Sequence, residues 1–146
     1  MIQEPDALAA AARGAAERLG PDTFCSIVLR SGEQLAYAGS SDERAERCDR
    51  VEVETGDGPC VTSLQHMAGV LVPEISGDPR WPAWRAAALD AGFRSAAALP
   101  AYVDETTRLA LNLYSDDVDP WDEARLAGMD EYLQEIAEVV RTTLGT

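Results

Sequence analysis

The spacing of apolar residues predicts a long amphipathic helix at each end of the chain. Near the N-terminus, apolar side chains recur every three or four positions over residues 6–19, and Gly20-Pro21 ends the pattern. The C-terminal pattern is stronger and predicts a helix that starts near Pro120. Its apolar stripe comprises Leu126, Met129, Leu133, Ile136, Val140 and Leu144. Both helices are expected to pack one face against a core.

Alternating and β-branched segments between these helices predict five strands. The first two strands and the last two form hairpins, with turns at Ser31-Gly32 and at residues 104–106. The predicted strands are residues 23–30, 34–38, 70–74, 94–103 and 108–115. A hairpin order of this kind favours an antiparallel sheet.

Shorter helices are predicted between the two hairpins. Ser40 to Asp42 offers helix caps before residues 43–49, a short charged helix or loop. Pro59 suits the first position of a helix that stops near Gly69. A third helix is expected to be capped by Asp78 and to run to about Ala91. Pro79 would occupy its first position, and Pro82 would break or restart it.

This order predicts a single α/β (α+β) domain over residues 1–146, with an antiparallel sheet of five to six strands. The long terminal helices should cover one face, and the short helices and loops should cover the other. Because loops cover a sheet less tightly than long helices do, we expect a ligand cavity on the short-helix face. Leu109, Leu111 and Leu113 should face the terminal helices, and Asn112 and Tyr114 should face the cavity.

Charge and composition narrow the choice of partners. The formal net charge is −14, and every cationic side chain is an arginine. Phosphate backbones and anionic lipids would repel such a surface, so neither nucleic acid nor membrane is an expected partner. No stretch approaches a membrane span, and the acidic N-terminus does not look like a signal peptide. Three widely spaced cysteines argue against a disulfide framework, and we expect a cytoplasmic protein.

Several short motifs in one order resemble the GAF domain, a family of small-molecule sensor modules in bacterial signalling proteins. They are Gly56-Asp57-Gly58-Pro59-Cys60, Val72-Pro73-Glu74-Ile75, Asp78-Pro79-Arg80-Trp81 and Leu109-Ala110-Leu111-Asn112-Leu113-Tyr114-Ser115. The resemblance implies an α/β/α arrangement with a ligand on the short-helix side. It is closest to GAF modules of actinobacterial sensors, and an arginine-only, alanine-rich composition suits a GC-rich genome. No output segment follows the domain, so the partner is expected to be a separate chain unless the sequence is a fragment.

Eight residues are candidates to line the ligand site. Trp81 and Trp84 share a helix face and could stack on a ligand, or simply close the hydrophobic layer over the strands. Asn112 would need a polar partner on the cavity side, and a backbone partner would suffice. The full set is Tyr37, Cys60, Leu64, Trp81, Trp84, Ser95, Asn112 and Tyr114.

Cys60 and His66 raise two chemical alternatives. A helix start would favour the Cys60 thiolate, as in the GAF-fold reductases of free methionine sulfoxide that the cysteine and its glycine turn resemble. Those enzymes use further cysteines on the next loop, and residues 75–85 contain none. Burial as a small packing residue is the simpler interpretation. His66, the single histidine, could ligate haem or lie on the surface, and no spacing indicates a metal site.

Three functions follow from these observations. The favoured one is a sensor domain without catalytic activity. It binds an unidentified small molecule and passes the ligand state to a signalling partner through its terminal helices, which also form a homodimer. The second is a Cys60-dependent thiol reductase. The third is a structural dimerisation module whose pocket has collapsed. The sequence selects no particular ligand or cofactor.

Overall fold

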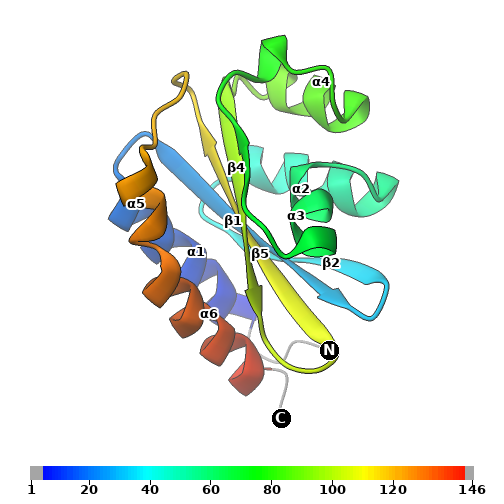
Figure 1. The fold of residues 1–146 in the computed structure, drawn as a ribbon, viewed down its shortest axis with the longest axis vertical. Coiled ribbons are helices and arrows are strands. Elements are labelled where there is room, and N and C mark those ends of the chain that lie inside the picture. Colours follow the sequence, from blue (N-terminus) through cyan, green and yellow to red (C-terminus); the bar gives the residue numbers. More distant parts are fainter. Residues whose placement is uncertain (1–4, 144–146) are drawn as a thin grey trace.

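A five-stranded antiparallel sheet lies at the centre of the protein in this computed structural model, which describes residues 5–143. The strand order is β2-β1-β5-β4-β3, with β5 in the middle (Figure 1). The strands are β1 Thr23–Ser31, β2 Gln34–Ser40, β3 Val70–Val72, β4 Ser95–Tyr102 and β5 Thr107–Ser115. All four strand pairs are antiparallel, and this confirms the predicted sheet and both hairpins.

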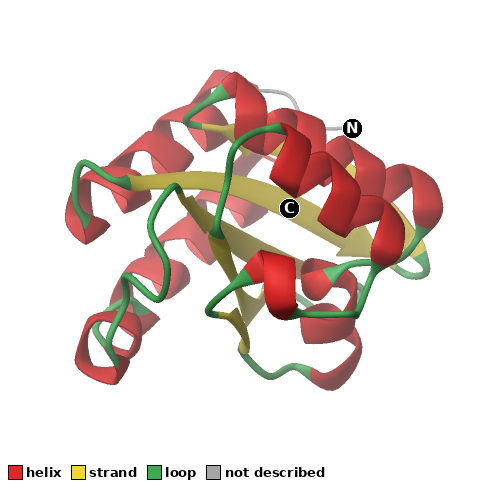
Figure 2. Ribbon diagram, turned by 90° about the horizontal axis from the view of Figure 1, so that it is seen from above, coloured by secondary structure: helices red, strands yellow, loops and turns green. Residues whose placement is uncertain are grey.

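Helices cover the two faces of the sheet unequally. The helices α1 and α6 pack together on one face, with short α5 before α6, and α2, α3 and α4 lie over the other face (Figure 1). Figure 2 shows the sheet between these two helical layers. The helices are α1 Pro5–Leu19, α2 Glu43–Thr55, α3 Pro59–His66, the 3-10 turn η1 Ile75–Gly77, α4 Pro82–Asp90, α5 Glu123–Ala127 and α6 Asp130–Thr143. None of the helices described is long and apolar enough to cross a membrane.

Strand β5 separates two different cores. Leu109, Leu111 and Leu113 belong to the core formed with α1 and α6, as expected from alternation along the strand. Ala110 and Tyr114 instead join two smaller clusters under α2, α3 and α4. The sheet is therefore buried on both faces, and the layer of short helices lies over the face that carries Asn112.

Helices α2 and α4 each have one boundary that differs from the sequence prediction. Helix α2 continues beyond Asp49 to Thr55, where Gly56 ends it in a left-handed conformation with φ 68°. Helix α4 begins at Pro82, because Asp78 caps only the Arg80 N–H and Trp81 is left-handed with φ 52°.

The C-terminal helix was predicted as one continuous segment, and that prediction was wrong. Asp122 caps α5 by accepting a hydrogen bond from the Arg125 N–H at 2.7 Å. The helix is interrupted at Gly128, and α6 begins at Asp130. The apolar spacing persists because Gly128 keeps a right-handed conformation. Leu144, the last member of the predicted stripe, lies outside the described residues.

Gly39 permits a close approach between strand β2 and helix α1. A Cβ atom at this position would lie 2.7 Å from the Ala9 backbone N and 2.9 Å from the Leu8 carbonyl carbon. Neither backbone atom can move without shifting the helix. The absence of a side chain at Gly39 therefore sets how closely α1 can pack on the sheet.

We expect Gly39→Ala to lower the free energy of unfolding by about 1–3 kcal/mol through this overpacking. Gly77→Ala is the matched control, because a Cβ there would meet only Glu74 Oε2 at 3.9 Å. Urea denaturation of both variants checks the prediction, and an equal effect of the two substitutions would contradict it.

Candidate functional site

A group of buried polar side chains lies between the sheet and helix α2. Asp49 and Glu52 project from α2, one helical turn apart, and each is at most 1% exposed. They meet polar residues of the two central strands, which are also buried. We call this group the polar cluster, and its members are Ser26, Asp49, Glu52, Asn112 and Tyr114.

Hydrogen bonds link the polar cluster across three elements. Asp49 Oδ1 accepts from Asn112 Nδ2 at 3.1 Å and from the Tyr114 hydroxyl at 2.9 Å. The same hydroxyl accepts from Trp84 Nε1 at 3.2 Å. The carboxylate of Asp49 therefore joins α2 to β5 and, through Tyr114, to α4.

Three oxygen atoms of the polar cluster are buried without a hydrogen-bond partner among the described residues. They are Asp49 Oδ2, Asn112 Oδ1 and Ser26 Oγ. Ser26 and Asn112 are directly opposite each other in the β1–β5 ladder, and the Asn112 amide touches Asp49. Buried polar atoms are usually paired, so three unpaired ones on adjoining side chains are unusual.

Glu52 forms the boundary between the polar cluster and helix α3. Its Oε2 accepts from the Cys60 backbone N–H at 2.9 Å, and it thereby caps a helix whose N-cap residue, Gly58, has no side chain. A Cβ at Gly58 would collide with the Glu52 carboxylate. The Gly-Asp-Gly turn therefore leaves room for a carboxyl group at the start of α3.

Burial raises the pKa of both carboxyl groups. For Asp49 the pKa rises to about 7, because loss of water outweighs the hydrogen bonds from Tyr114 and Asn112 and the effect of the nearby Ser26 hydroxyl, which lies outside hydrogen-bond geometry. For Glu52 the pKa rises to about 8, through burial and the nearby Asp49 charge. Neither carboxylate forms an ion pair with any arginine among the described residues. The two buried carboxyl groups therefore have no cationic partner among the described residues.

An aromatic cluster adjoins the polar cluster below α4. Trp81 meets Trp84 edge-on, with ring centroids 5.9 Å apart, and Phe93 stacks on Tyr114 at 4.8 Å. Trp81 Nε1 donates to Thr62 Oγ1 of α3 at 3.2 Å. Trp81 and Trp84 are both buried in the hydrophobic cluster that lies over the strands.

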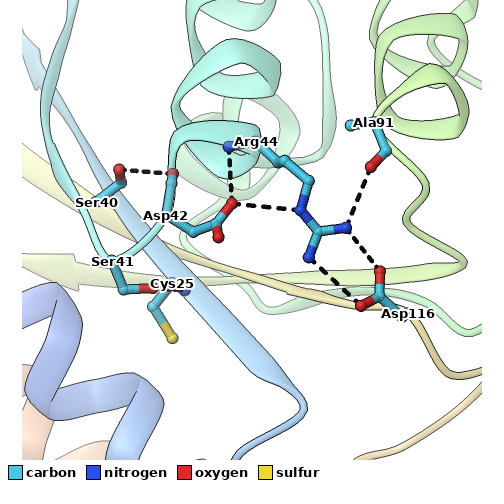
Figure 3. Close-up of polar contacts among 7 residues, drawn as sticks. All are labelled: Cys25, Ser40, Ser41, Asp42, Arg44, Ala91 and Asp116. Carbon is cyan, nitrogen blue, oxygen red and sulfur yellow. Dashed lines mark hydrogen bonds and ion pairs between the residues drawn. The ribbon is translucent and has the colours of Figure 1, made fainter.

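Arg44 fastens α2 to α4 beside these clusters (Figure 3). Its guanidinium donates to the Ala91 carbonyl oxygen at 3.2 Å and to Asp116 Oδ1 at 2.9 Å. The same group lies over the rings of Phe24 and Phe93, 4.7 and 4.5 Å from their centroids. This one side chain ties the N-terminal end of α2 to the C-terminal end of α4 and to the loop after β5.

The other sequence-predicted site residues lie around the polar cluster rather than within it. Leu64 packs with Cys60 in the small cluster under α3. The Ser95 hydroxyl donates to the Asp117 carbonyl oxygen at 2.5 Å, at the end of β4. The Tyr37 hydroxyl lies on edge strand β2 and donates to Ser40 Oγ at 3.1 Å. The structure therefore brings together Asn112, Tyr114 and Trp84, with Cys60 beside them.

Cys60 is fully buried, and this agrees with the simpler of its two interpretations. Burial, followed by the charges of Glu52 and Asp49, raises the pKa of its thiol well above the ordinary value. The thiolate expected from the helix start is therefore disfavoured. His66 is exposed at the end of α3. The described residues contain no cluster of histidine, cysteine and acidic side chains suited to a metal ion.

Buried hydrophobic side chains pack under α3 and α4. Surface hollows of about 150 to 440 Å³ occur elsewhere among the described residues. The hollow of about 440 Å³ is lined by Ala16, Thr23 and Phe24, among others, near the end of α1. None of these hollows is lined by Trp81, Trp84 or the polar cluster.

Sequence reasoning missed Ser26, Asp49 and Glu52. Asp49 and Glu52 stand in a charged segment that looked solvent-exposed. One signal was present: Ala45, Cys48, Asp49 and Glu52 recur at helical spacing, and these are the four buried residues of α2. Two small side chains on the same stripe as two acids indicate a buried acidic face.

Together, the sheet and its two unequal helical layers define an α/β/α domain with a buried polar cluster on one face of the sheet. The sequence model of the GAF domain matches residues 3–141. The chain therefore belongs to the GAF domain family, a family of small-molecule sensor and signalling domains.

Solved structures agree with this fold assignment. The chain is similar to a type II free methionine-R-sulfoxide reductase from Thermoplasma acidophilum, with TM-score 0.70, 15% identity, and 95% and 96% of the two chains covered. It is similar to a GAF domain/HD domain protein from Geobacter sulfurreducens, with TM-score 0.68, 14% identity, and 96% and 93% covered.

A third similar structure is a GAF domain from Synechocystis in its photoproduct state, with TM-score 0.64, 10% identity, and 95% and 94% covered. No curated protein matches the sequence significantly. At these low identities the likeness shows the fold alone.

The raised pKa values of Asp49 and Glu52 predict that stability falls as the pH rises. Between the ordinary pKa values of 3.8 and 4.5 and the native values of about 7 and 8, the native state holds protons that the unfolded chain has released. The free energy of unfolding should then decrease by at most about 1.4 kcal/mol per pH unit for each group. Urea denaturation at about pH 5.5 and about pH 8.5 measures this slope.

The double substitution Asp49→Asn and Glu52→Gln should flatten this dependence, because neither replacement titrates. Glu54→Gln, on the exposed side of the same helix, should leave it unchanged. A slope that survives the double substitution would show that other groups set the pH dependence.

Removing the Tyr114 hydroxyl should destabilise the protein. Tyr114→Phe takes a donor from Asp49 and leaves Trp84 Nε1 without its acceptor. We expect a loss of about 1–3 kcal/mol in the free energy of unfolding. Tyr102→Phe is the control, since Tyr102 is 54% exposed, and an equal cost for both would argue against a structural role for the network.

Proposed function

We propose that this domain is a sensor that binds a small molecule between the sheet and the layer formed by α2, α3 and α4. One observation carries the proposal: Asp49 Oδ2, Asn112 Oδ1 and Ser26 Oγ are buried and unpaired. A folded core tolerates such atoms at a cost, and a ligand that pairs them recovers that cost. Membership of the GAF family supports the same assignment.

Within the layer formed by α2, α3 and α4, the segment between α3 and α4 is best suited to move on ligand binding. Left-handed non-glycine residues stand near its two ends, Met67 with φ 49° and Trp81 with φ 52°. Such conformations are costly and occur at switch segments. In the proposed mechanism, this segment opens to admit the ligand, with Trp81 and Trp84 over it and Cys60 and Leu64 beside it.

The opposite face of the sheet would carry the signal. Leu133, Ile136 and Val140 of α6 are buried in the same hydrophobic core as the leucines of β5. A shift of β5 would therefore change the packing of the terminal helices. We propose that α1 and α6 also form the homodimer contact and pass the ligand state to a signalling partner. A shallow hollow between these helices, lined by Ala11, Tyr132 and Val139 among others, is the candidate surface.

Two other functions must be separated from the sensor. A thiol enzyme is the second candidate, since the Thermoplasma reductase has the same fold, although burial raises the pKa of the Cys60 thiol and speaks against an attacking nucleophile. The filled space under Trp81 and Trp84 favours a structural module with a collapsed pocket.

Native mass spectrometry of protein purified from cells tests these three functions. We expect extra mass that is lost on denaturation, and the native mass also counts the subunits. Cys60→Ser should retain this mass, since the thiol only packs the start of α3. A bare mass, together with no saturable binding in a metabolite screen, would support the structural module instead.

A turnover assay with free methionine-R-sulfoxide and dithiothreitol tests the enzyme directly. We expect no turnover by the wild-type protein. Turnover that Cys60→Ser abolishes and Cys25→Ser preserves would overturn the sensor and establish a reductase. Cys25 is a suitable control because it is buried on the other face of the sheet.

A further inference from the structure

The unpaired oxygen atoms of the polar cluster indicate the chemical class of the proposed ligand. Its three unpaired atoms are oxygens on adjoining side chains: Asp49 Oδ2, Asn112 Oδ1 and Ser26 Oγ. The amide oxygen of Asn112 and the ionised carboxylate of Asp49 accept hydrogen bonds, and a serine hydroxyl can accept one as well. A ligand group that pairs all three atoms as acceptors, with Asp49 ionised, offers three donors.

The charge of the site points in the same direction. Asp49 and Glu52 are both buried, and the residues three positions before and after Asp49 on its helix, Glu46 and Glu52, are both acidic. Arg44 and Arg47 lie close enough to act on Cys48, but neither forms an ion pair with Asp49 or Glu52. A buried carboxylate without a cation is costly unless it is neutralised.

We propose that the polar cluster binds the primary ammonium group of a small amine, with its three N–H donors directed to Asp49 Oδ2, Asn112 Oδ1 and Ser26 Oγ. An ammonium group supplies three donors and a positive charge in one group. A buried water molecule supplies only two donors and no charge. This inference rests on the proposed sensor function and names the ligand class for the same site.

The surroundings also indicate what the rest of the amine is like. Trp84 and Phe93 lie beside Tyr114 with ring centroids 6.3 and 4.8 Å from it, and Trp81 continues this aromatic surface. Aromatic faces favour both apolar groups and cations. The ligand class is therefore an amine with a small apolar or aromatic body that would displace part of this packing.

Methylammonium chloride is the smallest probe of the ammonium site. With two non-hydrogen atoms, its tightest expected Kd is on the order of 10 mM. At about 100 mM it should raise the Tm of the wild-type protein by about 3–6 °C over sodium chloride at equal ionic strength. Tetramethylammonium has the same charge but no N–H donor, so it should give no such shift.

Two carboxyl variants of helix α2 locate the effect. Asp49→Asn should abolish the methylammonium shift, measured against the variant's own Tm in sodium chloride. Glu54→Gln, with its exposed carboxyl removed, should keep the full shift. If Asp49→Asn does not fold, Ser26→Ala removes one of the three acceptors and should reduce the shift.

The outcomes separate this inference from the sensor function. Equal Tm values in methylammonium and sodium chloride would overturn the amine proposal and leave a buried water as the occupant. A ligand retained in native mass spectrometry would then still support a sensor of another ligand class. A shift that survives in Asp49→Asn would also overturn the proposal, because binding would lie elsewhere.

Discussion

Strand β5 is buried on both faces, and this constraint determines what the surrounding elements must supply. Its leucine face needs only apolar neighbours, which α1 and α6 provide. Its other face carries Asn112 and Tyr114, whose amide and hydroxyl lose water and need polar partners. Asp49 of α2 meets both groups, and Trp84 of α4 reaches the same hydroxyl. Polar contacts therefore add to the two hydrophobic clusters that hold the short-helix layer to the sheet.

Alternation along the strands predicted the two faces of the sheet correctly, because each residue of a strand points to the opposite side from its neighbour. The position of Asn112 and Tyr114 followed from that rule alone. The acids of α2 could not be found in this way. Asp49 and Glu52 look like the exposed Glu54 in the sequence, and only the packing of α2 on the sheet distinguishes them. Helix breaks at Trp81 and Gly128 likewise depend on backbone conformations that periodicity does not record.

The polar cluster departs from the rule that buried polar groups are paired, while the rest of the fold follows it closely. Sequences specify a structure when local preferences and packing agree, and exceptions concentrate at functional sites. Here the exception lies on the face of the sheet covered by α2, α3 and α4, where the ligand site is proposed. Cys60 illustrates the difference between position and reactivity. It stands at a helix start, yet burial and two nearby carboxyl groups keep its thiol protonated.

Arg44 makes the contacts between the short helices unequal in strength. On the seam between α2 and α4, its guanidinium binds a carbonyl oxygen and a carboxylate and lies on two aromatic rings. The hydrogen bond with Asp116 raises the pKa of Arg44 further, so the guanidinium keeps its positive charge. On the seam between α3 and α4, the hydrogen bond from Trp81 to Thr62 is a single neutral contact. The contact between α2 and α4 is therefore stronger than the contact between α3 and α4. A ligand is expected to reach the proposed site by displacing α3, while α2 stays in place.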